Sequence, residues 1–200
     1  MATREEANST KIPGHIEGEL TMKSPKLLAR IAGVFYLLTF VVGSAALYMG
    51  ANRADTVALI AGLCYVGVTV FFYVLFKPVN KTLAMVAAAF SLAGVVAGAL
   101  KVQPQGVVVG MVCFGFYCLL IGYLIFRSTF LPRVLGVLMA FAGLGWLTFL
   151  FPALAHQLAP FNLLPGVVGE GALTLWLLAF AVNAKRWWER AGDSSAALVA

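Results

Sequence analysis

The sequence predicts an all-α, polytopic membrane protein with six transmembrane helices in an antiparallel bundle. Three observations predict this fold class: the composition, six long apolar segments, and the placement of the basic residues. Of the 200 residues, 62% are hydrophobic and 11% are charged, whereas soluble domains are nearer half apolar and a quarter charged. A spanning helix needs about 20 apolar residues. Six such helices would use about 120 residues, which excludes a sizeable water-soluble domain.

The six apolar segments follow one another with short loops between them. Each has at least 18 residues, which makes a helix of about 27 Å or more, enough to cross the hydrocarbon core. Short loops predict that consecutive helices are antiparallel neighbours. None of the segments alternates apolar and polar residues as the strands of a membrane barrel do. The predicted helices are 27–49, 57–76, 83–100, 107–126, 134–151 and 163–182.

Polar residues and prolines mark several of the helix starts. Asp55 and Asn80 precede the second and third segments as N-cap candidates, and Pro132 precedes the fifth. Asn162 is the cap candidate of the sixth segment, with Pro165 in its first turn, where proline is tolerated.

One membrane domain, residues 25–190, is expected between two disordered tails. Residues 1–24 mix acidic and basic side chains without any period and predict a cytosolic tail. Ser44-Ala45-Ala46 resembles a signal-peptide cleavage site, but the polar stretch before the apolar run is too long and too acidic for a signal peptide. We therefore expect the first helix to be retained. Residues 191–200 are predicted to form the C-terminal tail.

The basic residues predict that both termini are cytoplasmic. Lys and Arg are enriched on the cytoplasmic side of membrane proteins. With six spans, twelve of the 14 basic residues fall on the side of the two termini. Only Arg53 and Lys101 fall on the other side. Trp187 and Trp188 follow Lys185 and Arg186 as an expected interfacial anchor.

Four stretches of the chain carry a resemblance to a known family. They begin at Arg30, Leu75, Gly122 and Gly169, and the turns Lys77–Lys81 and Ser128–Gly136 within them are the most specific parts. Over most of residues 27–183 the chain resembles the uncharacterised prokaryotic integral membrane family known as domain of unknown function 4386. The family typically has longer segments after the first and third helices. The resemblance implies a six-helix protein of a bacterial or archaeal cell membrane, and it implies no reaction.

Glu170 is the one acidic or basic residue well inside an apolar segment. Because a polar group in the bilayer is costly, such a residue is informative. It is a candidate site for a proton, a cation or a polar headgroup. The alternative is a structural carboxyl that is hydrogen-bonded to a hydroxyl or a backbone carbonyl of the next helix. In either case the side chain is expected to point into the bundle, because hydrocarbon offers it no partner.

Counting residues along each helix predicts which polar groups share the depth of Glu170. Glu170 lies about 10 Å below the outer end of its helix. The same depth is reached by Ser44 on the first helix, Tyr65 on the second and Thr148 on the fifth, and Thr174 lies one turn deeper on the face of Glu170. We therefore expect a polar layer of Glu170 with some of these four residues, as a candidate binding site.

Other side chains are assigned ordinary roles. Cys64, Cys113 and Cys118 lie in apolar runs and predict no disulfides. The lone His156 predicts a solvated loop, and Trp146, Trp176 and the tyrosines predict packing or interface groups. No metal site, cofactor or nucleic-acid partner is expected.

Three function classes remain, and the third of them, an enzyme, is discounted because one buried carboxylate makes no acid–base pair. The first class is a protein that binds or carries a small molecule or ion in the bilayer. The second is a structural or regulatory membrane subunit that packs against a protein partner. The bilayer is the expected environment of both.

Overall fold

The computed structural model describes residues 24–46, 48 and 51–196. All regular elements in these ranges are helices, and six of the helical segments are long and apolar enough to cross a membrane. The chain is therefore a multi-pass membrane protein. The expected tail over residues 1–24 lies outside the described residues, apart from Ser24. The helices are α1 (Pro25–Ala46), α2 (Ala51–Phe76), α3 (Lys81–Ala99), α4 (Val109–Arg127), α5 (Arg133–Leu147), α6 (Pro152–Leu158), α7 (Leu164–Ala179) and α8 (Ala184–Ala196).

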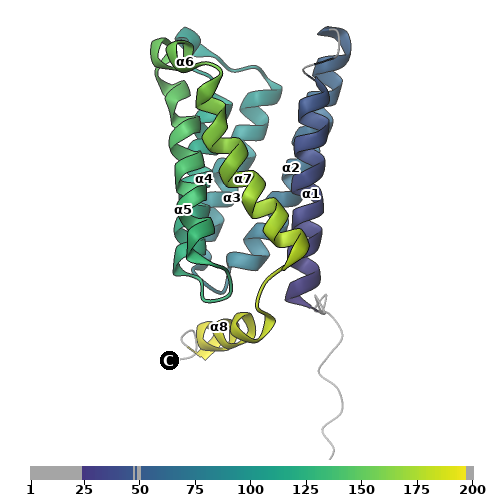
Figure 1. Cartoon of the computed structure of the whole chain (residues 1–200), viewed down its shortest axis with the longest axis vertical. Coiled ribbons are helices and arrows are strands. Elements are labelled where there is room, and N and C mark those ends of the chain that lie inside the picture. The colour runs from purple at the N-terminus through teal and green to yellow at the C-terminus, as the bar shows by residue number, and fades with distance from the viewer. Residues whose placement is uncertain (1–23, 47, 49–50, 197–200) are drawn as a thin grey trace, which may run out of the picture.

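The six spanning helices form a closed ring around an aromatic interior. Neighbours pack in the order α1, α2, α3, α4, α5 and α7, and α7 also packs against α1. Helix α7 crosses obliquely between α5 and α1 (Figure 1). The short α6 lies at one end of the bundle, while α8 lies across the other end, where α1 also begins (Figure 1). Inside the ring Tyr36, Tyr65, Phe72 and Tyr117 are all buried.

Glycines allow a close contact between α4 and α5. A Cβ atom at Gly122 would lie 2.7 Å from the carbonyl oxygen of Gly136, and one at Gly136 would lie 2.6 Å from the carbonyl oxygen of Gly122. Two turns away, Gly115 and Gly143 repeat the arrangement. Small residues let backbones approach closely in membrane helices, where van der Waals packing drives association.

Helix α8 is the main departure from the expected architecture. Residues 191–196, predicted as part of a disordered tail, form its last turns, and residues 197–200 lie outside the described residues. The indole Nε1 of Trp187 donates to the carbonyl oxygen of Leu75 at 2.9 Å, and the amide of Asn183 donates to the carbonyl oxygen of Phe130 at 3.1 Å. These bonds fix α8 to the base of the bundle, where an amphipathic helix suits a membrane interface.

Helix ends agree with the sequence signals at one cap and differ at two. The Asn80 cap of α3 is confirmed, since its Oδ1 accepts the amide of Leu83 at 2.9 Å. Asp55 is not a cap, because α2 begins at Ala51 and the carboxylate instead pairs with Lys101 Nζ at 2.8 Å. Asn162 is not a cap either.

The α-helices of the fifth and sixth spans, α5 and α7, are shorter than predicted, because 3-10 turns make up part of each span. Helix α5 ends at Leu147 because the chain tightens into a 3-10 turn over Thr148–Leu150. Pro152 then begins α6 in the segment expected to be a loop, at the first position of a helix, which tolerates proline. A second 3-10 turn, Phe161–Leu163, leads into α7.

Candidate functional site

The candidate site is centred on Glu170, near the middle of α7. Its side chain is buried, with 5% of the residue exposed. Two glycines of the same helix bring α7 against α5. A Cβ atom at Gly169 would overlap the carbonyl oxygen of Leu138, and one at Gly166 would overlap the ring of Trp146. Because only glycine allows these approaches, the local sequence places the Glu170 carboxyl within reach of α5.

Three side chains from three other helices donate hydrogen bonds to the Glu170 carboxyl. The hydroxyl of Tyr36 on α1 donates to Oε2 at 2.7 Å. The indole of Trp146 on α5 donates to Oε1 at 2.5 Å, and the thiol of Cys118 on α4 donates to the same oxygen at 3.7 Å. Both oxygens are therefore bound, and one carboxyl joins four helices of the ring.

All three of these donors to Glu170 are neutral. Charged groups buried in proteins are normally paired with an opposite charge. The ion pair of Lys101 with Asp55 lies instead at the exposed ends of α2 and α3. An ionised Glu170 would thus carry a charge that hydrogen bonds stabilise but that none of these partners neutralises.

Two further tyrosines continue the polar centre away from Glu170. The hydroxyl of Tyr65 lies 3.5 Å from that of Tyr36, and the two rings meet edge to face. Tyr117 packs its ring against Tyr65, with centroids 5.8 Å apart. The Tyr117 hydroxyl is buried and has no hydrogen-bond partner among the described residues. An unsatisfied buried group costs about 1–3 kcal/mol, so the Tyr117 hydroxyl is a local energetic cost in the centre of the ring.

Of the four residues expected beside Glu170, two lie near it. Tyr65 is linked to the carboxyl through Tyr36. Thr174 is buried one turn along α7, and its hydroxyl donates to the backbone carbonyl of Glu170 at 2.8 Å rather than to the carboxyl. A threonine bonded in this way satisfies itself within its own helix.

The other two expected residues lie elsewhere. Ser44 is exposed on the outside of α1. Thr148 lies in the 3-10 turn after α5, where its hydroxyl donates to the carbonyl oxygen of Gly145 at 2.7 Å and accepts from Asn162 at 3.4 Å. The structure therefore brings neither hydroxyl to Glu170.

Tyr36 and Cys118 were not predicted as partners of Glu170, and Trp146 was predicted only as a packing or interface group. Depth along a helix does not fix the angle at which a side chain leaves the helix axis. At about 100° per residue, Ser44 lies about 80° around α1 from Tyr36. Ala29 and Ala32 precede Tyr36 by seven and four residues and are fully buried. Their spacing marks the inner face of α1 and is the signal that leads to Tyr36.

Among the residues that the structure describes, metal-binding side chains do not gather around Glu170. Within the described residues no group of three or more His, Cys, Asp or Glu side chains could hold a metal ion. His156 is exposed on α6. The donor set of Glu170 consists of N–H, O–H and S–H groups, which suit a carboxyl oxygen.

A known protein family matches the part of the chain that contains most of the spanning helices. A family model described as a domain of unknown function, DUF4386, matches residues 54–104 and 94–181, which is more than half of the chain. The matched part includes Tyr65, Cys118, Trp146 and Glu170, but not Tyr36. No curated protein and no solved structure matches the chain.

Proposed function

The chain belongs to the family described as a domain of unknown function, DUF4386, and we propose that Glu170 gives it the function of binding an ion, the proton, within the bilayer. The observation that carries the proposal is the carboxyl itself, buried and held by neutral donors from three other helices. A charge without a counter-ion is costly in hydrocarbon. Uptake of a proton removes that cost, and release restores it.

Protonation of Glu170 would change the packing of the ring. An ionised carboxylate accepts strong hydrogen bonds from Tyr36 and Trp146, whereas a protonated one gains a donor and loses acceptor strength. Because these partners stand on α1 and α5, the proton would alter contacts at both neighbours of α7. The hydroxyls of Tyr36 and Tyr65, 3.5 Å apart, would carry the first step of the proton's movement away from the carboxyl.

We further propose an antiparallel bundle in a prokaryotic cell membrane with both termini cytoplasmic. The excess of basic residues on the side of the termini supports this orientation. The start of α1 and helix α8 lie at the same end of the bundle (Figure 1), which is consistent with it. Glu170 has no catalytic role in this proposal, since proton binding needs no second acid or base.

The alternative, a subunit that works by packing against a partner, needs a surface of small residues, such as the glycines of α3 and α4. Gly94 on α3 and Gly110 on α4 already pack against each other within the chain. A Cβ atom at Gly110 would lie 3.1 Å from the carbonyl oxygen of Gly94 and 3.2 Å from the amide of Gly98. The glycines thus explain contact between two helices of one chain, and they do not require a partner.

Infrared difference spectroscopy of the protein in lipid nanodiscs tests the proposal. Between acid and alkaline pH, the carbonyl stretch of a protonated carboxyl should vanish as Glu170 ionises. Glu170→Gln should remove this change. The matched variant Asp55→Asn removes an exposed carboxyl and should leave the buried-carboxyl band in place. The proposal is overturned if every pH-dependent carboxyl band of the wild type is also present in Glu170→Gln.

A second measurement avoids any change at Glu170. With Trp176, Trp187 and Trp188 replaced by phenylalanine, the fluorescence of Trp146 reports the bond of its indole to the carboxyl. The emission should shift with pH along the same titration as the infrared band. Emission that stays constant while the protein remains folded would identify Glu170 as a structural carboxyl, as the alternative function predicts.

A further inference from the structure

A cavity of about 610 Å³ opens at the base of the bundle. Its walls are the α4–α5 loop, the end of α7, the start of α8 and the first turn of α1. Neither Glu170 nor its three donors line it, so the cavity is separate from the carboxyl site. Its lining includes Lys26, Thr129, Trp176, Lys185 and Arg186.

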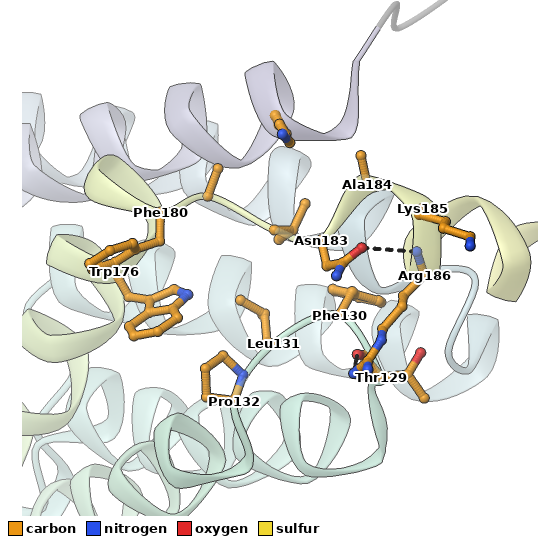
Figure 2. Close-up of a pocket in the computed structure, with 13 residues that line it drawn as sticks. Thr129, Phe130, Leu131, Pro132, Trp176, Phe180, Asn183, Ala184, Lys185 and Arg186 are labelled. Atoms are coloured by element: carbon orange, nitrogen blue, oxygen red, sulfur yellow. Dashed lines mark hydrogen bonds between the residues drawn. The ribbon is translucent and has the colours of Figure 1, made fainter.

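The cavity has an apolar end and a cationic end. Figure 2 shows Trp176, Phe180 and Pro132 at one end and Lys185, Arg186 and Thr129 at the other. The rings of Trp176 and Phe180 have centroids 4.6 Å apart and are tilted by 36°, and Phe180 is 68% exposed. A ligand that fills such a space has an apolar part beside the bundle and an anionic part beside α8.

The cationic end keeps capacity for an anion. Among the described residues Lys26 and Lys185 form no ion pair. The guanidinium of Arg186 donates to the carbonyl oxygen of Thr129 at 3.1 Å, which leaves several of its five N–H donors for a ligand. One acid, Glu189, lines the adjoining smaller cavity together with Arg186. Three cations against one neighbouring acid favour an anionic ligand.

The backbone around the cavity is held in place before any ligand arrives. The amide of Asn183 donates to the carbonyl oxygen of Phe130, which ties the α7–α8 linker to the α4–α5 loop. The side chain of Asn183 accepts the amide of Arg186 at 3.2 Å (Figure 2). The position of Arg186 is therefore set from two sides, by its own amide and by its guanidinium.

We propose that this cavity binds the phosphate headgroup and upper acyl chain of an anionic glycerophospholipid. The cavity lies where the spanning helices end and the amphipathic α8 begins, which is the depth of lipid headgroups. Basic residues at that depth attract anionic lipids, whereas a free phosphate would gain nothing from the aromatic end. Lipid binding here is independent of proton binding at Glu170.

Native mass spectrometry of the full chain tests the proposal with two lipids of equal chain length, phosphatidylglycerol and phosphatidylcholine. The wild type should retain phosphatidylglycerol in preference. Lys185→Gln should lower the ratio of bound phosphatidylglycerol to bound phosphatidylcholine about fivefold, because one basic residue near the membrane surface contributes about 1 kcal/mol to the binding of an anionic lipid. Lys77→Gln removes an exposed charge outside the cavity and should leave the preference unchanged.

Two further measurements test whether the cavity binds a whole lipid, and not a free phosphate or a headgroup held by charge alone. Phe180→Ala should weaken retention of phosphatidylglycerol with no change of charge, because the acyl chain loses its contact. Soluble glycerol phosphate should not displace the lipid. The proposal is overturned if both lipids are retained equally by the wild type, if Lys77→Gln acts as strongly as Lys185→Gln, if Phe180→Ala retains the lipid as the wild type does, or if glycerol phosphate displaces the lipid.

Discussion

Replacing Gly136 with alanine should destabilise the protein through the contact of α4 with α5. The added Cβ atom would lie 2.6 Å from the carbonyl oxygen of Gly122 and 2.9 Å from the amide of Phe126. Ordinary contacts of this kind begin at 3.4 Å, so the helices must separate locally by about 0.8 Å. Both obstructing groups belong to the backbone and cannot rotate away.

The expected loss follows from two opposing effects. Overpacking that shifts backbone costs about 1–3 kcal/mol. Alanine recovers about 0.5–1 kcal/mol relative to glycine inside a helix. The difference spans about 0–2.5 kcal/mol. Because two backbone groups obstruct the new Cβ atom, we expect Gly136→Ala to lower the free energy of unfolding by about 1–2 kcal/mol. In Gly171→Ala the new Cβ atom meets nothing within 4 Å, so this matched variant should be neutral or slightly more stable.

Unfolding in detergent micelles titrated with dodecyl sulfate measures both variants. Gly122→Ala should behave as Gly136→Ala does, because its Cβ atom meets the facing carbonyl at 2.7 Å. The double variant should lose less than the sum of the two, since one separation of the helices relieves both overlaps. The reasoning is refuted if Gly136→Ala is as stable as the wild type, or if Gly171→Ala loses as much.

Three further substitutions test local contacts by the same unfolding assay. Tyr36→Phe should cost about 1–2 kcal/mol because Glu170 Oε2 loses its donor; an unchanged stability would show that this bond contributes nothing. Asn80→Ala should cost about 1 kcal/mol through loss of the α3 cap, and Asn80→Asp should retain most of it. Lys101→Ala should change stability by less than about 0.5 kcal/mol, because both side chains of its ion pair are more than 60% exposed; a larger loss would contradict that estimate.

Apolar run length and composition were sufficient to predict the six spans. The bilayer requires a minimum length of apolar helix, and the length of each apolar run can be counted in the sequence. The ends were less predictable. Asp55 looked like a cap, but the polar residues before it also entered α2, because a helix can continue into water beyond the membrane. Helix α8 is polar, so no apolar run marked it, although Trp187 and Trp188 marked its position.

The centre of the site was predictable and its surroundings were only partly so. Glu170 stood out because its charge is rare in such a segment. Its partners depend on the angle of each helix in the ring and on the tilt of α7, which no depth count supplies. Trp146 reaches Glu170 because Gly166 leaves room for its ring. The role of Gly166 follows only from the packing of α7 against α5, which the sequence does not show.

The bond between Tyr36 and Glu170 also has a consequence for synthesis of the chain. The two residues are 134 positions apart, which at about 5–20 residues per second corresponds to about 7–27 s of translation. During that interval the inner face of α1 is in the membrane without the partner that closes the ring. A nascent chain that terminates before α7 therefore exposes the Tyr36 hydroxyl and the Trp146 indole inside an open bundle. Closure by the last spanning helix is thus the structural difference between a finished chain and a truncated one, because only the finished chain supplies the carboxyl that binds both groups.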